Sequence, residues 1–127
     1  MKSLSTLLGG AAILLLSQAA WAGEMPFNQA QFEHALRAGK PVVVDFSADW
    51  CPTCRAQKPL IIAILQKPEM APLTVFVANF DSEKALKQAL RVTTQSTLVA
   101  FKDGKEVARS TGQTQQDQLH ALMSKAL

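Results

Sequence analysis

The sequence predicts an α/β domain in which a central mixed β-sheet of about four strands is flanked by helices on both faces. Two observations lead to this fold class. Apolar runs typical of strands alternate along the chain with segments whose apolar residues have helical spacing. The chain is 127 residues long and 48% hydrophobic, and only 18% of it is charged. These values fit one folded domain rather than a disordered tail.

The first 22 residues have the pattern of a secretory signal peptide. Lys2 provides the positive start, residues 7–16 form an apolar run, and Ala20-Trp21-Ala22 matches the small-x-small rule for cleavage. Ten helical residues cover about 15 Å, roughly half of a bilayer core. We therefore expect cleavage and a mature domain at 23–127 that is exported, in bacteria to the periplasm. Anchoring in the inner membrane by residues 4–22 is the alternative.

The first half of the mature chain predicts a helix, a strand and a second helix. Met25 lies near the new N-terminus and is expected to be mobile. Asn28 is a good N-cap for a helix that ends at Gly39. The run PVVVDF at 41–46 is typical of a strand buried on both faces, and a helix is expected over 51–66.

The second half alternates in the same way. Strands are expected at 73–79 and 97–101, with a helix at 82–90 between them. Asp103-Gly104 indicates a tight turn into a returning edge strand at 105–110. Thr114 and Asp117 have the spacing of a capping box for a final helix. The hairpin makes the sheet mixed, because the preceding strands are joined by helices and are expected to be parallel.

Two cysteines lie where the first predicted strand meets the second helix. Cys51 is expected at the helix N-terminus, where free N–H groups and the helix dipole favour a thiolate. Cys54 is one turn away, close enough for a disulfide. A reactive Cys51 also requires access to water. The alternatives are an inert structural disulfide, half of a zinc site, or two unpaired core thiols, although His34 and His120 are single and distant.

The segment VVVDFSADWCPTC resembles the signature of the thioredoxin superfamily. Pro59, five residues after the second cysteine, is similar to the helix-kinking proline of that family. TLVAFKDGKEVARSTG at 97–112 looks like its terminal hairpin. The resemblance covers residues 27–127 and implies a thioredoxin-like fold for the mature domain.

The resemblance also implies roles for single residues. Cys51 would be the attacking cysteine, Cys54 the resolving one, and the two would form a redox-active Cys51–Cys54 disulfide. Asp45 would be a buried carboxylate that takes the proton from Cys54, rather than an edge-strand residue facing solvent. Trp50 would cover one side of the site, with a plain core position as the alternative. The residues implied to contact the substrate are Trp50, Pro52, Thr53, Gln95 and Ser96.

Two departures from the family pattern concern this site. Ser96 stands where the family has a cis-proline, and a cis bond before serine costs about 2.5–4 kcal/mol against 0.5–1 for proline. The loop is therefore expected to be trans or strained. The lysine that partners the buried carboxylate in cytosolic thioredoxins is absent, and Val77 takes its place.

The function expected from these residues is that of an exported thiol–disulfide oxidoreductase that reduces disulfides of protein partners. Its reductant would be a membrane-embedded or periplasmic thiol electron donor. A reducing direction is favoured because Asp45 is retained and no histidine separates the cysteines. No cofactor or resident metal is expected. Nucleic-acid binding is not expected either, because the net charge of +3 is spread along the chain. The alternatives are a metal or iron–sulfur module that uses Cys51 and Cys54, and a non-catalytic adaptor.

Overall fold

The computed structural model describes residues 10, 12, 13 and 23–127. The expected signal peptide at 1–22 therefore lies outside the described residues, apart from those three positions. Among the described residues, no helix is long and apolar enough to cross a membrane. The elements in chain order are β1 (Gly23–Pro26), α1 (Gln29–Arg37), β2 (Val42–Ser47), α2 (Pro52–Leu65), a 3-10 turn (Pro68–Met70), β3 (Thr74–Asn79), α3 (Lys84–Leu90), β4 (Thr97–Lys102), β5 (Lys105–Thr111) and α4 (Gln116–Ser124).

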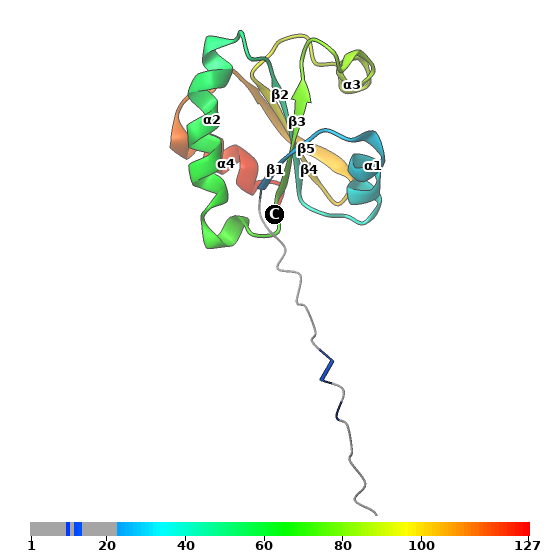
Figure 1. Ribbon diagram of the computed structural model, residues 1–127. Coiled ribbons are helices and arrows are strands. Elements are labelled where there is room, and N and C mark those ends of the chain that lie inside the picture. Colours follow the sequence, from blue (N-terminus) through cyan, green and yellow to red (C-terminus); the bar gives the residue numbers. More distant parts are fainter. Residues whose placement is uncertain (1–9, 11, 14–22) are drawn as a thin grey trace, which may run out of the picture.

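The strands form one mixed sheet in the order β1-β3-β2-β4-β5. β3 is parallel to both β1 and β2, whereas β4 is antiparallel to β2 and β5. The expectation that the strand at 97–101 runs parallel to the strands before it is therefore wrong, because the segment that carries α3 brings the chain back beside β2 in the opposite direction. Figure 1 shows α2 and α4 on one side of this sheet and α1 and α3 on the other. The predicted α/β fold, with a mixed sheet covered on both faces, is confirmed.

The sheet has five strands rather than about four, because β1 adds an edge strand that the sequence analysis missed. Met25 lies opposite Phe76 of β3 and packs against the apolar cluster on the α1 side of the sheet. The expectation that Met25 is mobile is therefore wrong. The segment GEMP has no apolar alternation of its own, so its strand conformation comes from pairing with the otherwise free edge of β3.

Alternation along β2 divides the core between the two faces of the sheet. Val42, Val44 and Phe46 contribute to the cluster beneath α1 and α3. Val43 contributes to the cluster beneath α2 and α4. Because successive side chains of a strand point to opposite faces, Asp45 lies on the same face as Val43, beneath α2. The fold thus places a carboxyl group under the helix that begins at the cysteines.

The sequence predicted the turn of the terminal hairpin correctly but not the N-cap of the helix that follows the hairpin. The expected turn is confirmed: Asp103 and Gly104 both have positive φ, 51° and 78°, as a two-residue hairpin turn requires. The predicted capping box is wrong, because the N-cap of α4 is Gln115 and its side chain makes no capping bond. Asp117 instead accepts a hydrogen bond from the backbone N–H of Gln118.

Candidate functional site

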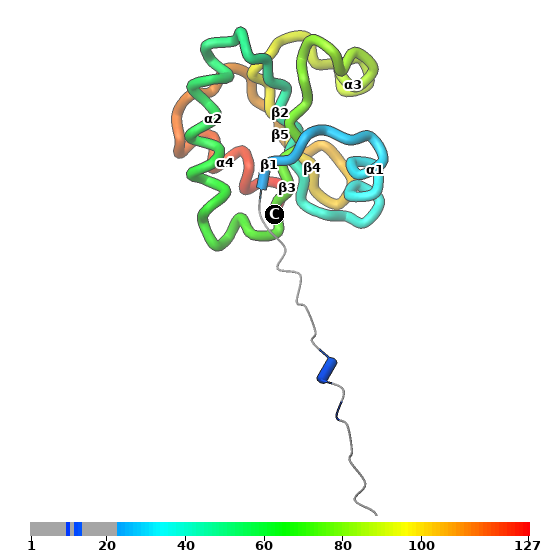
Figure 2. The backbone as a smooth tube through the Cα atoms, in the orientation of Figure 1, coloured from blue at the N-terminus to red at the C-terminus, as the bar shows by residue number. Residues whose placement is uncertain are grey.

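The two cysteines lie at the start of α2, where Cys51 precedes the helix and Cys54 lies in its first turn. Figure 2 shows the path of the chain from β2 into this helix. Cys51 is the N-cap residue, and its sulfur accepts a hydrogen bond of 3.1 Å from the backbone N–H of Cys54. Pro52 follows in the first turn, where its missing N–H leaves no helical hydrogen bond unmade. The motif therefore caps its own helix with the sulfur that is expected to react. Both cysteines are free thiols in this structure.

The surroundings of Cys51 favour its thiolate. Burial raises the pKa of the Cys51 thiol, but hydrogen bonds from the side chains of Cys54 and Ser96 and from the backbone of Cys54 and Thr53 lower it. The hydrogen bonds outweigh burial, and the pKa lies below its ordinary value. A thiolate is the nucleophilic form of cysteine, so the lowered pKa favours Cys51 as a nucleophile.

The Cys51 side chain is less accessible than its expected role requires. Cys51 is only 1% exposed and Cys54 5%, and both pack in a small apolar cluster with Ala48 and the ring of Phe80. The expectation of a water-accessible sulfur is therefore wrong for this conformation.

Ser96 is the residue that joins the two sulfurs. Its Oγ lies 3.1 Å from the sulfur of Cys51 and 3.1 Å from that of Cys54. All peptide bonds among the described residues are trans, and Ser96 adopts a left-handed backbone with φ of 63°. Its N–H donates to the carbonyl of Phe46 at 2.8 Å, which ties the loop to β2. A hydroxyl thus occupies the place beside the sulfurs where the resemblance leads one to expect a proline ring.

Gln57 holds this loop in place and was not identified from the sequence. Its side chain is buried on α2, and its Nε2 donates to the carbonyls of Ser96 at 3.3 Å and Gln113 at 2.9 Å. A glutamine three residues after Cys54, on the side of the helix whose other residues are Cys54 and apolar side chains, was the signal available in the sequence. Its partners lie 39 and 56 residues away, so local patterns could not reveal them.

The other residues expected to contact substrate surround the cysteines with varied exposure. Trp50 is 55% exposed, which excludes the core alternative, and its indole N–H donates to the carboxylate of Asp81 at 2.8 Å. Pro52 is exposed, whereas Thr53 and Gln95 are half-buried. The structure therefore provides an exposed aromatic side chain immediately before the buried cysteine pair.

Asp45 lies in an interior strand and is 6% exposed, which excludes the edge-strand alternative. Burial and the nearby carboxylate of Glu24 raise its pKa to about 7, although the ammonium group of Lys58 opposes this shift. Its Oδ1 has no hydrogen-bond partner in the structure. A carboxyl group with such a pKa can both accept and release a proton near neutrality.

The described residues contain no group of three or more His, Cys, Asp or Glu side chains that could hold a metal ion. The Cys51–Cys54 disulfide and the roles of the surrounding residues stay predictions.

Comparison with known proteins places this site in a defined context. The thioredoxin family model matches residues 24–125. Thioredoxin of Chlamydia trachomatis is 35% identical over 98 residues, which cover 77% of this chain and 93% of the relative. An H-type thioredoxin of Chlamydomonas reinhardtii is 32% identical, covering 93% and 96%. A crystal structure of Trxlp from Edwardsiella tarda is 40% identical with a TM-score of 0.77, covering 80% of this chain and 98% of that one.

Proposed function

Because the chain belongs to the thioredoxin family, we propose that it is an exported reductase that uses Cys51 and Cys54 to reduce disulfides of protein partners. Membership makes it a thioredoxin-type thiol–disulfide oxidoreductase, which acts on protein disulfides and draws electrons from a reductant. The export, the reducing direction and a membrane-embedded or periplasmic thiol donor are the proposed parts.

One observation carries the assignment of the site: the N-cap sulfur of α2 has a lowered pKa and lies within one helical turn of a second thiol. The Cys51 thiolate attacks one sulfur of a substrate disulfide, so that a mixed disulfide forms and one substrate thiolate leaves. Cys54 then loses its proton to Asp45 and attacks the sulfur of Cys51. The Cys51–Cys54 disulfide forms, the second substrate thiolate leaves, and two electrons have passed to the substrate.

Reduction of insulin by the protein in the presence of dithiothreitol tests the reductase activity. The wild-type chain is expected to accelerate precipitation of the insulin chains, and Cys51→Ser is expected to remove the acceleration. Cys54→Ser is expected to accumulate a mixed disulfide, because the resolving thiol is absent. Equal rates for the wild type and Cys51→Ser would reject the proposal.

The proposed export rests on the signal pattern of residues 1–22. Expression of the full chain in a bacterium, followed by fractionation and N-terminal sequencing, tests it. A periplasmic product that begins at Gly23 is expected. Full-length chain in the inner-membrane fraction would favour the anchored alternative, and full-length chain in the cytoplasm would contradict export.

A further inference from the structure

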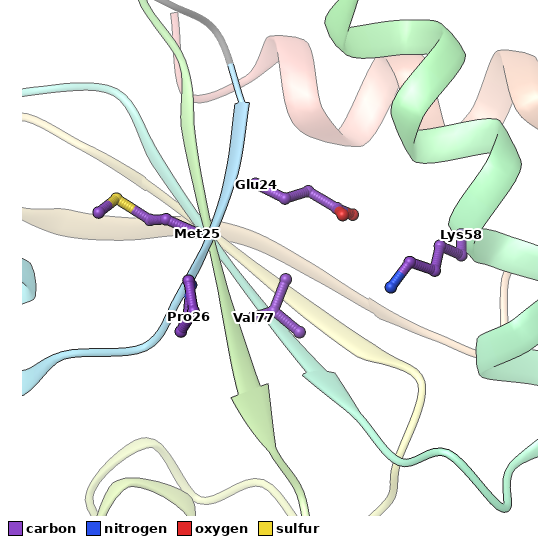
Figure 3. Close-up of a pocket in the computed structure, with 5 residues that line it drawn as sticks. All are labelled: Glu24, Met25, Pro26, Lys58 and Val77. Carbon is purple, nitrogen blue, oxygen red and sulfur yellow. The ribbon is translucent and has the colours of Figure 1, made fainter.

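A pocket of about 320 Å³ opens between β1 and α2, on the side of the sheet that carries Asp45. Glu24, Met25, Pro26, Lys58 and Val77 line it. Figure 3 shows the carboxylate of Glu24 and the ammonium group of Lys58 extending toward each other from β1 and α2. No ion pair joins these two groups, so the pocket separates them.

Strand register places Asp45 beside this pocket. Asp45 lies opposite Val77 of β3, and Val77 lies opposite Pro26 of β1. Glu24 is two residues before Pro26 and therefore points to the same face of the sheet. Asp45 is buried on that face, and its Oδ1 has no hydrogen-bond partner. A buried carboxyl without a partner is sensitive to the charges nearest to it.

The helix above this face, α2, carries both Lys58 and the resolving thiol of Cys54. Cys54 and Lys58 are four residues apart on α2 and so lie on one side of the helix. At the register of Asp45, the neighbouring strands β3 and β4 present only Val77 and Leu98. Among the described residues, the charged groups that act on Asp45 are thus Glu24 from β1 and Lys58 from α2, and Cys54 lies one turn before Lys58 on the same helix.

The two charged groups act on Asp45 in opposite directions. Burial raises the pKa of Asp45 most, the negative charge of Glu24 raises it further, and the positive charge of Lys58 lowers it. Glu24 is itself half-buried, and its pKa is raised by burial and lowered by Lys58. The positive charge of Lys58 therefore lowers the pKa of both Glu24 and Asp45, and the protonation of each carboxyl group depends on the other.

We propose that Glu24 and Lys58, on opposite sides of this pocket, are positioning residues that set the charge of Asp45 and thereby the rate of the resolving step. This inference rests on the proposed function. Val77 occupies the place of the family's lysine on β3, and Lys58 supplies the positive charge from α2 instead.

In the resolving step, the proton of Cys54 moves to Asp45, the Cys54 sulfur bonds to Cys51, and the bond between Cys51 and the substrate breaks. Only the ionised carboxylate of Asp45 can take that proton.

Two substitutions that each replace a charged side chain with an uncharged one, and that have opposite expected effects, test this inference. Lys58→Met removes the positive charge, so Asp45 is ionised less and the resolving step at pH 6.5 is expected to slow about two- to fourfold. Glu24→Gln removes the negative charge, and the same step is expected to accelerate by about two- to fourfold. The rate is measured as release of a substrate peptide in rapid-mixing experiments between pH 5.5 and 8.5. The Asp45 titration is followed independently by carbon NMR of its carboxyl group in the dithiol form.

Matched controls separate the local effect from loss of net charge or of fold. Lys84→Met on α3 and Glu33→Gln on α1 make the same charge changes on the other face of the sheet and are expected to leave both readouts unchanged. In an Asp45→Asn background, Lys58→Met and Glu24→Gln are expected to have no effect on the pH profile.

The outcomes distinguish this inference from the proposed function. Shifts of the Asp45 titration in the same direction for both variants, or no shift for either, would overturn the inference even if the wild type reduces insulin. If the two variants shift the Asp45 titration in opposite directions but the wild-type chain reduces no disulfide, the charge effect on Asp45 is supported and the proposed function is rejected. Opposite NMR shifts without a change in the resolving rate would overturn the link to catalysis.

Discussion

Ser96 places one hydroxyl oxygen within 3.1 Å of both cysteine sulfurs. A single hydroxyl can donate only one hydrogen bond at a time, so Ser96 can donate to one sulfur while its oxygen accepts from the other thiol. When Cys51 is a thiolate, donation to that sulfur stabilises the charge and lowers the pKa of Cys51. A proline at this position has no such donor. The serine therefore gives this chain a means of stabilising its nucleophile that acts through a hydrogen bond.

Ser96→Ala is expected to raise the pKa of Cys51 and slow its alkylation. A hydrogen bond to a charged group contributes about 1.5–3 kcal/mol, so the alkylation rate below pH 7 is expected to fall by roughly tenfold or more. Reaction with iodoacetamide across pH 5–9 measures both the pKa and the limiting rate. Ser110→Ala is the matched control, because Ser110 is a hydroxyl on β5 that has no hydrogen-bond partner. An unchanged pKa in Ser96→Ala would show that the hydroxyl does not stabilise the thiolate.

At the scale of elements, α2 and the loop before β4 are held together by few polar contacts. Gln57 joins the helix to the carbonyls of Ser96 and Gln113, while the N–H of Gly112 donates to the carbonyl of Ser96 at 3.0 Å. Two of these bonds, one from α2 and one from the segment after β5, end at the carbonyl of Ser96. The position of the Ser96 hydroxyl therefore depends on how three separate segments pack.

Gln57→Leu is expected to loosen this junction while preserving the apolar packing of α2. The loss of two hydrogen bonds lowers the free energy of unfolding by about 1–3 kcal/mol, although the Ser96 carbonyl keeps its bond from the N–H of Gly112. Hydrogen exchange is expected to quicken at Gly112 and Ser96, and urea unfolding measures the stability. Gln88→Leu on the exposed side of α3 controls for removal of an amide. Unchanged exchange at both positions would contradict the assigned role of Gln57.

At the scale of the whole molecule, Asp45 links folding to pH. The pKa of Asp45 is about 7 in the folded chain, against an ordinary value of 3.8. Between these values the folded chain holds a proton that the unfolded chain has lost, so unfolding releases a proton. The contribution of Asp45 to the free energy of unfolding is therefore fully present below about pH 4 and is lost as the pH rises through 7. The total change is roughly 4 kcal/mol, because one pKa unit corresponds to about 1.4 kcal/mol.

Asp45→Asn is expected to remove this pH dependence. At pH 8 the variant is expected to be more stable than the wild type by up to about 4 kcal/mol, and the advantage is expected to shrink toward pH 4. Urea unfolding of both proteins at several pH values measures the difference. Asp103→Asn, in the exposed hairpin turn, is the control for loss of a carboxylate. A stability difference that does not vary between pH 4 and 8 would argue against a raised pKa for Asp45.

The sequence by itself determined the order of helices and strands after Asn28 and the place of the two cysteines between β2 and α2. These features follow from local periodicity and from helix-end chemistry, which act over a few neighbouring residues. The hairpin turn at Asp103-Gly104 was predictable for the same reason, since two adjacent residues supply the required positive φ.

Only the tertiary structure decided what surrounds the cysteines. Ser96 lies 45 and 42 residues from Cys51 and Cys54, yet its hydroxyl contacts both sulfurs. Glu24 and Lys58 approach Asp45 from different elements, and β1 exists as a strand because β3 offers it an edge. The burial of Cys51, too, depends on the packing of separate segments. Such contacts follow from the register of strands and the placement of helices across the sheet, and local sequence patterns do not encode these long-range distances.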